Sequence, residues 1–194
     1  MNTWELNGHI LEYFDDTHTY LVDGIIVPSI TQILKIKFKN KYNGVNEEVL
    51  NRASQRGTEV HEAIEKLCKN GEVEDLKEVK NFMFLQKQYK FNVLDNEVPI
   101  ILFKDETPVG AGRLDLVLEE NNQLGLGDIK RTSVLDKEYL AYQLNLYKIG
   151  YQQCYGKEIT FLKGIHLRED VRKYVNIPIN EMLVNKLVEE YIGG

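Results

Sequence analysis

The sequence predicts an α/β (α+β) fold, with a central mixed sheet flanked by helices and an N-terminal β-hairpin and helical segment ahead of the sheet. Two observations support this. Short apolar runs bounded by turn residues, which are typical of strands, occur in the first 30 residues and again from residue 98 onward. Residues 47–89 instead carry apolar side chains at helical spacing. A chain of 194 residues without repeats or linkers is expected to form one domain.

The N-terminal part is expected to be mainly β. Strands are predicted at Ile10–Phe14, Thr19–Val22 and Ile25–Val27, because Asp and Gly turn residues separate them. Ser29 is a candidate N-cap for a short helix at Ile30–Ile36.

Helical periodicity dominates the next part. A helix is predicted over Glu47–Asn70, with Gly71 as its C-terminal stop. Gly57 lies inside this helix and is expected to break or kink it. A further helix is predicted over Leu76–Tyr89.

Strands and helices alternate in the rest of the chain. The predicted elements are strands at Val98–Phe103, Gly110–Leu118 and Leu124–Ile129, a helix at Lys137–Gln153, strands at Ile159–Leu167 and Tyr174–Ile177, and a helix from Asn180 to Tyr191. The single domain 1–194 therefore divides into an N-terminal β-hairpin and basic segment (1–45), a helical segment (46–92) and a core (93–194).

Composition and charge exclude several classes of protein. The net charge of −6 does not fit a protein that coats nucleic acid with its whole surface, although it permits a local basic groove or a carboxylate site neutralised by a cation. Cys68 and Cys154 are too few for a disulfide framework or a four-cysteine metal site. Because no apolar run approaches a membrane span and Met1–Ile10 has no signal-peptide pattern, we expect a cytoplasmic protein without a membrane partner.

One predicted hairpin brings acidic and basic side chains together. Its turn is expected at Asn121 and Asn122, because Asn tolerates the positive φ that a two-residue turn requires. That register places Asp115 directly opposite Asp128, with their Cβ atoms about 4.5–5.5 Å apart. Lys130 follows Asp128 by two residues and therefore shares its face.

Two carboxylates this close repel each other unless one is protonated or a cation lies between them. Oxygen ligands of this kind suit Mg²⁺ or Mn²⁺, and a neighbouring lysine can stabilise negative charge on a phosphate or position a water. Gly125 and Gly127 are expected beside the site, where small residues let a ligand approach the backbone. The alternative is a surface hairpin in which Lys130 pairs with both aspartates.

Four sequence motifs resemble those of one enzyme family. The runs GRLDLVL (112–118) and LGLGDIKRT (124–132) resemble the core motif of PD-(D/E)XK nucleases. The run QLNLY (143–147) resembles the Q-x-x-x-Y motif of the RecB-like branch, and RGTEVH (56–61) resembles its upstream G-x-x-x-H segment. Residues 17–31 resemble the start of phage-encoded exonucleases of this branch. The lack of four cysteines places the resemblance with members that have no iron–sulfur cluster.

The resemblance implies a restriction-endonuclease-like core and a role for each matching residue. The implied metal ligands are His61, Asp115, Asp128 and the carbonyl of Ile129. Lys130 would serve the attacking water, and Gln143 and Tyr147, four apart on one helix face, would organise the site. Glu65, one turn after His61, and Glu97 are candidates for a supporting shell around the metal, with a solvated or salt-bridging role as the alternative.

Basic residues supply candidate DNA contacts. Arg52 and Arg56 lie one helical turn apart and either contact phosphates or pair with nearby acidic residues. The alternating lysines, with Phe38 and Tyr42 between or beside them, would share one face of an extended chain that guides DNA, or would form a solvated basic loop. These lysines are Lys35, Lys37, Lys39 and Lys41.

The sequence thus predicts a metal-dependent DNA nuclease that hydrolyses phosphodiester bonds, most simply an exonuclease acting on DNA ends or single strands. The alternative is a non-catalytic DNA-end-binding or regulatory module on the same fold. A small-molecule hydrolase would need a nucleophile motif such as G-x-S-x-G, which is absent. A Walker loop is also absent, so ATP-driven work would need a partner, and a recombinase, helicase or single-strand-binding protein is a candidate. The resemblance implies the cytoplasm of a bacterial or phage-infected cell.

Overall fold

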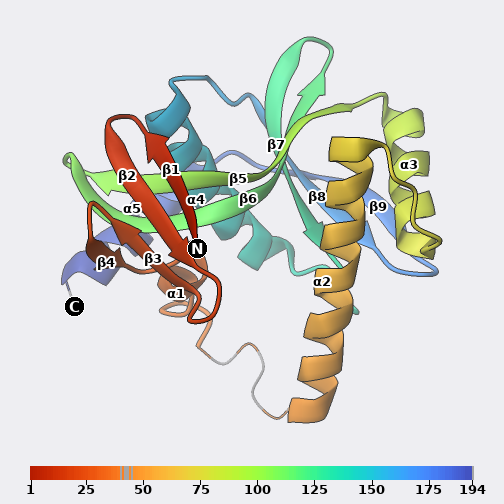
Figure 1. The fold of residues 1–194 in the computed structure, drawn as a ribbon, viewed down its shortest axis with the longest axis horizontal. Helices are drawn as coiled ribbons and strands as arrows, with labels where there is room; N and C mark the ends of the chain where they lie inside the picture. Colours follow the sequence, from red (N-terminus) through yellow and green to blue (C-terminus); the bar gives the residue numbers. More distant parts are fainter. Residues whose placement is uncertain (40, 42–43, 45, 194) are drawn as a thin grey trace.

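The structure is a computed structural model that describes residues 1–39, 41, 44 and 46–193. The described chain is mixed α/β, with two sheets and five helices (Figure 1). In chain order the elements are β1 (Asn2–Leu6), β2 (His9–Phe14), β3 (Thr19–Val22), β4 (Ile25–Val27), α1 (Ile30–Leu34), α2 (Glu47–Asn70), α3 (Lys77–Tyr89), β5 (Asn92–Lys104), β6 (Thr107–Glu120), β7 (Gln123–Lys130), α4 (Lys137–Tyr155), β8 (Phe161–Leu167), β9 (Arg172–Ile177) and α5 (Glu181–Gly193).

The N-terminal sheet is an antiparallel meander in the order β1-β2-β3-β4. Sequence reasoning missed β1, whose residues are mostly exposed and carry little apolar signal. The buried face of the meander packs on Ile101 and Ala111 of the second sheet. A parallel bridge between Ser29 and Ala111, with a 2.9 Å hydrogen bond from Ala111 N to Pro28 O, joins the two sheets just before α1.

The second sheet has the order β5-β6-β7-β8-β9. All neighbouring strands are antiparallel except β7 and β8, which are parallel and are connected by the long helix α4. This is the mixed sheet that the sequence predicts, and β5 and β6 are both longer than expected. The crossover through α4 follows from the parallel pair, because a parallel connection needs a dozen or more residues.

The expected break at Gly57 is wrong, because α2 is one continuous helix of 24 residues. Gly57 lies on an open surface where an added Cβ would meet nothing within 4 Å. A glycine inside a helix costs about 1 kcal/mol relative to alanine, and the 24-residue helix absorbs that cost. The predicted stop is confirmed, since Gly71 ends α2 with a left-handed backbone at φ +71°.

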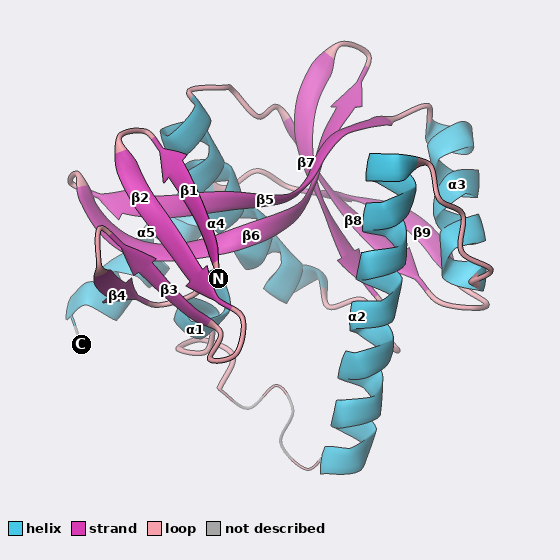
Figure 2. Cartoon of the chain, viewed as in Figure 1, coloured by secondary structure: helices cyan, strands magenta, loops and turns pink. Residues whose placement is uncertain are grey.

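Helices cover both faces of the second sheet and give each face its own apolar core (Figure 2). Helices α1, α4 and α5 pack on one face and α2 and α3 pack on the other. The cap expected at Asn180 is confirmed, because its side chain accepts a 3.2 Å hydrogen bond from Leu183 N at the start of α5. The acidic residues singled out from the sequence lie where α2, β5, β6 and β7 meet.

Candidate active site

The predicted hairpin and its register are confirmed. Asn121 and Asn122 have φ values of +50° and +62°, as a two-residue primed turn requires. The β6–β7 ladder extends from the turn as far as Leu116 opposite Gly127, so Asp115 and Asp128 form the next pair. At that pair the Asp115 carboxylate itself accepts a 2.7 Å hydrogen bond from the backbone N–H of Ile129.

A third carboxylate lies on the other side of Asp115. The pairing of β5 with β6 places Leu114 opposite Val98, and the adjacent position places Glu97 opposite Asp115. Glu97 has a left-handed backbone at φ +51°, and it is the one non-glycine residue inside a strand with positive φ among the residues the structure describes. Because such a conformation is costly for a bulky residue, it is retained only where the surroundings impose it.

The side chains of β6 switch from one face of the sheet to the other at Asp115, which lies opposite Glu97 and its left-handed backbone. Leu114 packs in the core under α4, whereas Leu116 packs in the core under α2 and α3. Residues two apart on a regular strand would share a face. The local disruption therefore directs the Asp115 and Glu97 carboxylates toward α2, away from both apolar cores.

His61 of α2 completes this acidic centre. Its Nε2 lies 3.1 Å from the carbonyl oxygen of Ile129, and its Nδ1 lies 3.7 Å from Oδ2 of Asp115. His61, Glu97 and Asp115 each offer one ligand atom within 4.8 Å of the others. They line a cavity of about 10 Å³, which is room for about one water-sized sphere. One imidazole nitrogen, two carboxylates and a carbonyl form a donor set that fits Mn²⁺ or Mg²⁺.

The buried Asp128 and the partly exposed Lys130 form an ion pair next to this cavity. Asp128 is 2% exposed, and the Lys130 ammonium contacts its Oδ2. Within the described chain, neither Asp128 oxygen accepts a hydrogen bond of ordinary geometry. Burial, together with the Asp115 charge, raises the pKa of Asp128 to about 6 against the opposing charge of Lys130. Lys130 therefore does not compensate for both the burial of Asp128 and the nearby charge of Asp115, and a bound cation would supply the missing positive charge.

The charges of the centre also shift its other groups. Burial lowers the pKa of Lys130, but Asp128 and Asp115 more than offset this, so the pKa is raised overall and the ammonium stays charged. Burial raises the pKa of Glu97 and the Asp115 charge raises it further, while Arg113, whose Nε lies 3.6 Å from Glu97, lowers it. Sequence reasoning missed Arg113, although it stands two residues before Asp115 in the motif.

Helix α4 presents Gln143 and Tyr147 to the same region, as predicted. Both side chains are buried, and Oε1 of Gln143 has no hydrogen-bond partner among the described residues. The pKa of Tyr147 is raised well above its usual value, first by burial and then by the charges of Asp115 and Asp128. The phenol is thus held neutral beside the carboxylates, where it can act as a hydrogen-bond donor.

Glu65 lies at the edge of the acidic centre. It lines the small cavity together with His61, one helical turn earlier, but its ion pair is with Lys69 at 2.5 Å. It therefore adds negative charge near the histidine without a contact that orients the imidazole ring.

Arg52 and Arg56 do not form a shared phosphate-binding pair. Arg56 forms ion pairs with Glu59 at 3.0 Å and with the fully buried Glu78 of α3 at 3.4 Å. The exposed Arg52 donates to the carbonyl of Glu48 on its own helix, at 3.4 Å. The geometry matches the alternative of pairing with nearby acidic residues for Arg56, which ties α2 to α3.

The four lysines do not lie on an extended chain, so that prediction is wrong. The chain turns after α1 instead, because Phe38 packs edge-on against Tyr139 and Tyr142 of α4. This packing turns two of the lysines toward the acidic first turn of α4: Lys37 lies 3.1 Å from Glu138, and Lys41 lies 3.1 Å from Asp136.

The remaining parts of the expected DNA-guiding segment are only partly placed. Lys35 and Lys39 are exposed to solvent. Tyr42 lies outside the described residues. Phe38 is partly buried in its packing against α4.

The glycines of β7 do not flank the site, and this prediction is also wrong. A Cβ added at Gly125 would lie 2.2 Å from the Phe161 ring, and one at Gly127 would lie 2.8 Å from Leu118. These positions are small because core side chains pack directly on the strand, on the face opposite the Asp128 carboxylate.

Comparison with known proteins gives little guidance. No family model matches the chain, and no curated protein matches it. One similar solved structure, the crystal structure of SSO0001, is 14% identical with a TM-score of 0.49, and the match covers 86% of this chain and 75% of that chain. A similarity of this size identifies neither a family nor an activity. Among the described helices, none is both long and apolar enough to cross a membrane.

Proposed function

We propose that the chain is a metal-dependent DNA nuclease that hydrolyses phosphodiester bonds. One observation carries the proposal: three carboxylates on adjacent strands, Glu97, Asp115 and Asp128, lie beside an imidazole and two cationic groups, the ammonium of Lys130 and the guanidinium of Arg113. A purely structural cluster would balance these charges within the protein, because uncompensated buried charges are costly. A functional site retains the imbalance for its ligand.

The order of elements supports a restriction-endonuclease-like core for this proposal. Strands β5, β6 and β7 form an antiparallel meander, and α4 then crosses to the parallel strand β8. The two aspartates lie on the second and third strands of the meander, and Gln143 and Tyr147 lie on the crossover helix. This arrangement follows the motif order on which the sequence resemblance rests.

His61, Glu97, Asp115 and the Ile129 carbonyl would hold a divalent cation, with Asp128 beside it. A cation bound there would supply a Lewis acid for the phosphoryl oxygen and lower the pKa of a bound water. The acidic centre would also cease to repel DNA, which matters for a chain with a net charge of −6.

The chain's own residues provide the other elements of hydrolysis. In the reaction, a water oxygen forms a bond to phosphorus, the phosphorus–oxygen bond of the leaving group breaks, and the leaving oxygen gains a proton. The charged Lys130 would orient the water and stabilise the negative charge that develops on the phosphate. Gln143 and the neutral Tyr147 would donate hydrogen bonds from α4 and fix the carboxylates in position.

The proposal is tested by incubating the purified protein with end-labelled linear and circular DNA in Mg²⁺, Mn²⁺ or EDTA. The expected result is cleavage in either metal and none in EDTA. Loss of label from linear DNA with circular DNA intact would indicate an exonuclease, and cutting of circles an endonuclease. Binding of DNA without cleavage in any metal would favour the non-catalytic alternative.

A further inference from the structure

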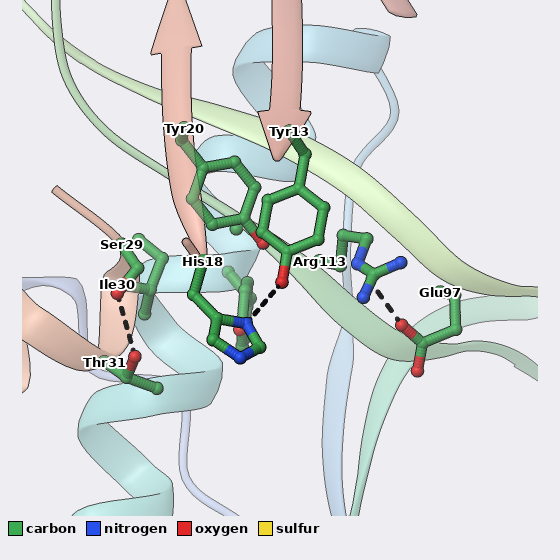
Figure 3. Close-up of a pocket in the computed structure, with 10 residues that line it drawn as sticks. Tyr13, His18, Tyr20, Ser29, Ile30, Thr31, Glu97 and Arg113 are labelled. Carbon is green, nitrogen blue, oxygen red and sulfur yellow. Dashed lines mark hydrogen bonds and ion pairs between the residues drawn. The ribbon is translucent and has the colours of Figure 1, made fainter. Parts of the chain in front are cut away.

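A second, larger cavity lies beside the acidic centre and shares Glu97 with it. Its volume is about 260 Å³. Figure 3 shows that its walls come from the β2–β3 hairpin, the start of α1 and the strands β5 and β6. The lining residues that matter below are Tyr13, His18, Tyr20, Thr31, Glu97 and Arg113.

Arg113 supplies the positive charge of this cavity. Its Nε lies 3.6 Å from Glu97, and its guanidinium carbon lies 4.8 Å from the centre of the Tyr13 ring. A side-chain hydrogen bond with Tyr20 also holds the guanidinium, and these contacts do not use all five of its N–H donors. A planar fork held in this way matches the oxygens of a phosphate group.

Aromatic rings line the cavity next to Arg113 (Figure 3). Tyr13 and Tyr20 pack with their ring centres 4.6 Å apart, and the Tyr13 hydroxyl is hydrogen-bonded to Nδ1 of His18 at 2.7 Å. His18 is exposed at the hairpin tip, with a left-handed backbone at φ +50°. Tyr13 and Tyr20 are buried, so the exposed His18 ring is the surface on which an unpaired base can stack.

The junction between β4 and β6 bounds the cavity on the side away from the acidic centre. Following β6 from Asp115 past Arg113, the cavity ends where Ala111 bridges to Ser29 and donates a 2.9 Å hydrogen bond to Pro28 O. A DNA strand that enters past Glu97 and follows β6 therefore meets the joined backbones of the two sheets. The volume lies just below the roughly 300 Å³ at which small-molecule pockets begin, which suits one nucleotide better than several.

We propose, on the basis of the proposed function, that this cavity receives the terminal nucleotide of a single DNA strand. The base lies against the His18 ring, which the Tyr13 hydroxyl holds in place, and a phosphate of that nucleotide is bound by Arg113. The adjoining phosphodiester then lies beside Glu97 and Asp115. The cavity would thus make the nuclease dependent on a free strand end.

The test compares binding of a short single-stranded oligonucleotide in linear and circularised form. Fluorescence anisotropy is measured with Mg²⁺ in an Asp128→Asn background, so that the probe remains intact. Arg113→Lys keeps the charge beside Glu97 but removes the planar fork. His18→Asn removes the ring and keeps a residue that tolerates a left-handed backbone. His9→Asn is the matched control, because it makes the same change in the same sheet outside the cavity lining.

The background protein is expected to bind the linear probe more tightly than the circle. Arg113→Lys and His18→Asn should each bind the linear probe about 10-fold more weakly and leave circle binding unchanged. His9→Asn should match the background protein on both probes. Linear probes with and without a terminal phosphate then show whether Arg113 binds a terminal phosphate or the internal phosphate of the end nucleotide.

Unchanged affinity of both cavity variants for the linear probe would overturn the inference, and so would an equal loss on linear and circular probes. This failure is distinct from failure of the proposed function. A wild-type protein that cleaves linear DNA with Mn²⁺ while the cavity variants bind normally would contradict the cavity alone. End-selective binding without any cleavage would contradict the nuclease proposal alone.

Discussion

Two buried carboxylates near β7 have opposite surroundings. Glu78 of α3 is fully buried and accepts a 2.7 Å hydrogen bond from Arg131 Nε, with Arg56 at 3.4 Å on its other oxygen. Asp128 is equally buried and contacts one ammonium, that of Lys130. The first is enclosed by positive charge, and the second lies beside further carboxylates.

This difference reverses the effect of burial on each group. Burial alone would raise both pKa values. For Glu78 the charges and hydrogen bonds of Arg131 and Arg56 more than offset burial, so its pKa is lowered. For Asp128 burial prevails over Lys130, and Asp115 adds to it, so its pKa is raised. The balanced carboxylate joins α2 and α3 to the sheet, whereas the unbalanced one marks the site that needs a cation.

The largest expected effect comes from removing a charge from the unbalanced centre. Asp115→Asn should reduce DNA cleavage by about 10³-fold or more, because a carboxylate that would hold the cation is lost. Asp128→Ala should have a similar effect on cleavage. In EDTA, Asp115→Asn should be as stable as the wild type or more stable in urea unfolding, since like-charge repulsion is relieved. Full activity in either variant would refute the site assignment.

Lys130→Ala separates binding of the cation from turnover. This change should lower the cleavage rate about 10²-fold, because the ammonium would act on water and phosphate. Calorimetric titration should show that Mn²⁺ still binds, since the four proposed ligand groups remain. A Lys130→Ala protein that no longer binds Mn²⁺ would show that the lysine has a structural role instead.

Removing the charge of Glu78, the balanced carboxylate, should have the reverse effect, with stability reduced and activity kept. Glu78→Gln should reduce the free energy of unfolding by about 2 kcal/mol, because the partly exposed Arg131 and Arg56 lose the carboxylate that they bind. The folded variant should keep its cleavage rate at saturating substrate and bind Mn²⁺ normally. An unchanged urea midpoint would show that Glu78 does not join the helices to the sheet.

The pKa of Glu78 also predicts that the free energy of unfolding falls as the solution is acidified. The folded pKa of Glu78 is lowered, so its contribution is present above its unfolded pKa of about 4.3 and is lost as the pH falls through the folded value. Urea unfolding from pH 7 to pH 3 should therefore show the gap between wild type and Glu78→Gln closing at the acid end. A gap that widens on acidification would contradict this.

The smallest effect is expected from exposed charges that neither centre uses. Replacing Lys35 and Lys39 with glutamine should lower the slope of log affinity against log salt for single-stranded DNA by about 0.7 for each lysine that contacts a phosphate. Anisotropy titrations at several salt concentrations measure this slope. Identical slopes in the two proteins would exclude these lysines from the DNA path.

Local patterns in the sequence predicted the unbalanced centre better than the balanced one. The Asn121–Asn122 turn fixes the register of one hairpin, so the meeting of Asp115 and Asp128 follows from short-range chemistry. The buried pairing of Glu78 with Arg131 joins residues 53 positions apart, and no local spacing indicates it.

The wrong predictions likewise concern features that long-range packing determines. Gly57 has poor helix propensity, but the long helix around it continues, because tertiary packing outweighs a single residue. The alternating lysines suggested an extended chain, but Phe38 packs against α4 and the chain turns. Glu97 is a candidate from the sequence only through the family resemblance, whereas its place opposite Asp115 depends on the long-range pairing of β5 with β6.

The contrast between Glu78 and the carboxylates of the acidic centre is tested most directly by measuring the free energy of unfolding at increasing Mn²⁺ concentration. The account predicts that wild type and Glu78→Gln both gain about 2.7 kcal/mol in free energy of unfolding at a Mn²⁺ concentration of 100 times Kd. Asp115→Asn should gain little or nothing at the same concentration. A wild type that does not respond to Mn²⁺, or an Asp115→Asn variant that responds as the wild type does, would contradict the claim that the unbalanced carboxylates form a metal centre.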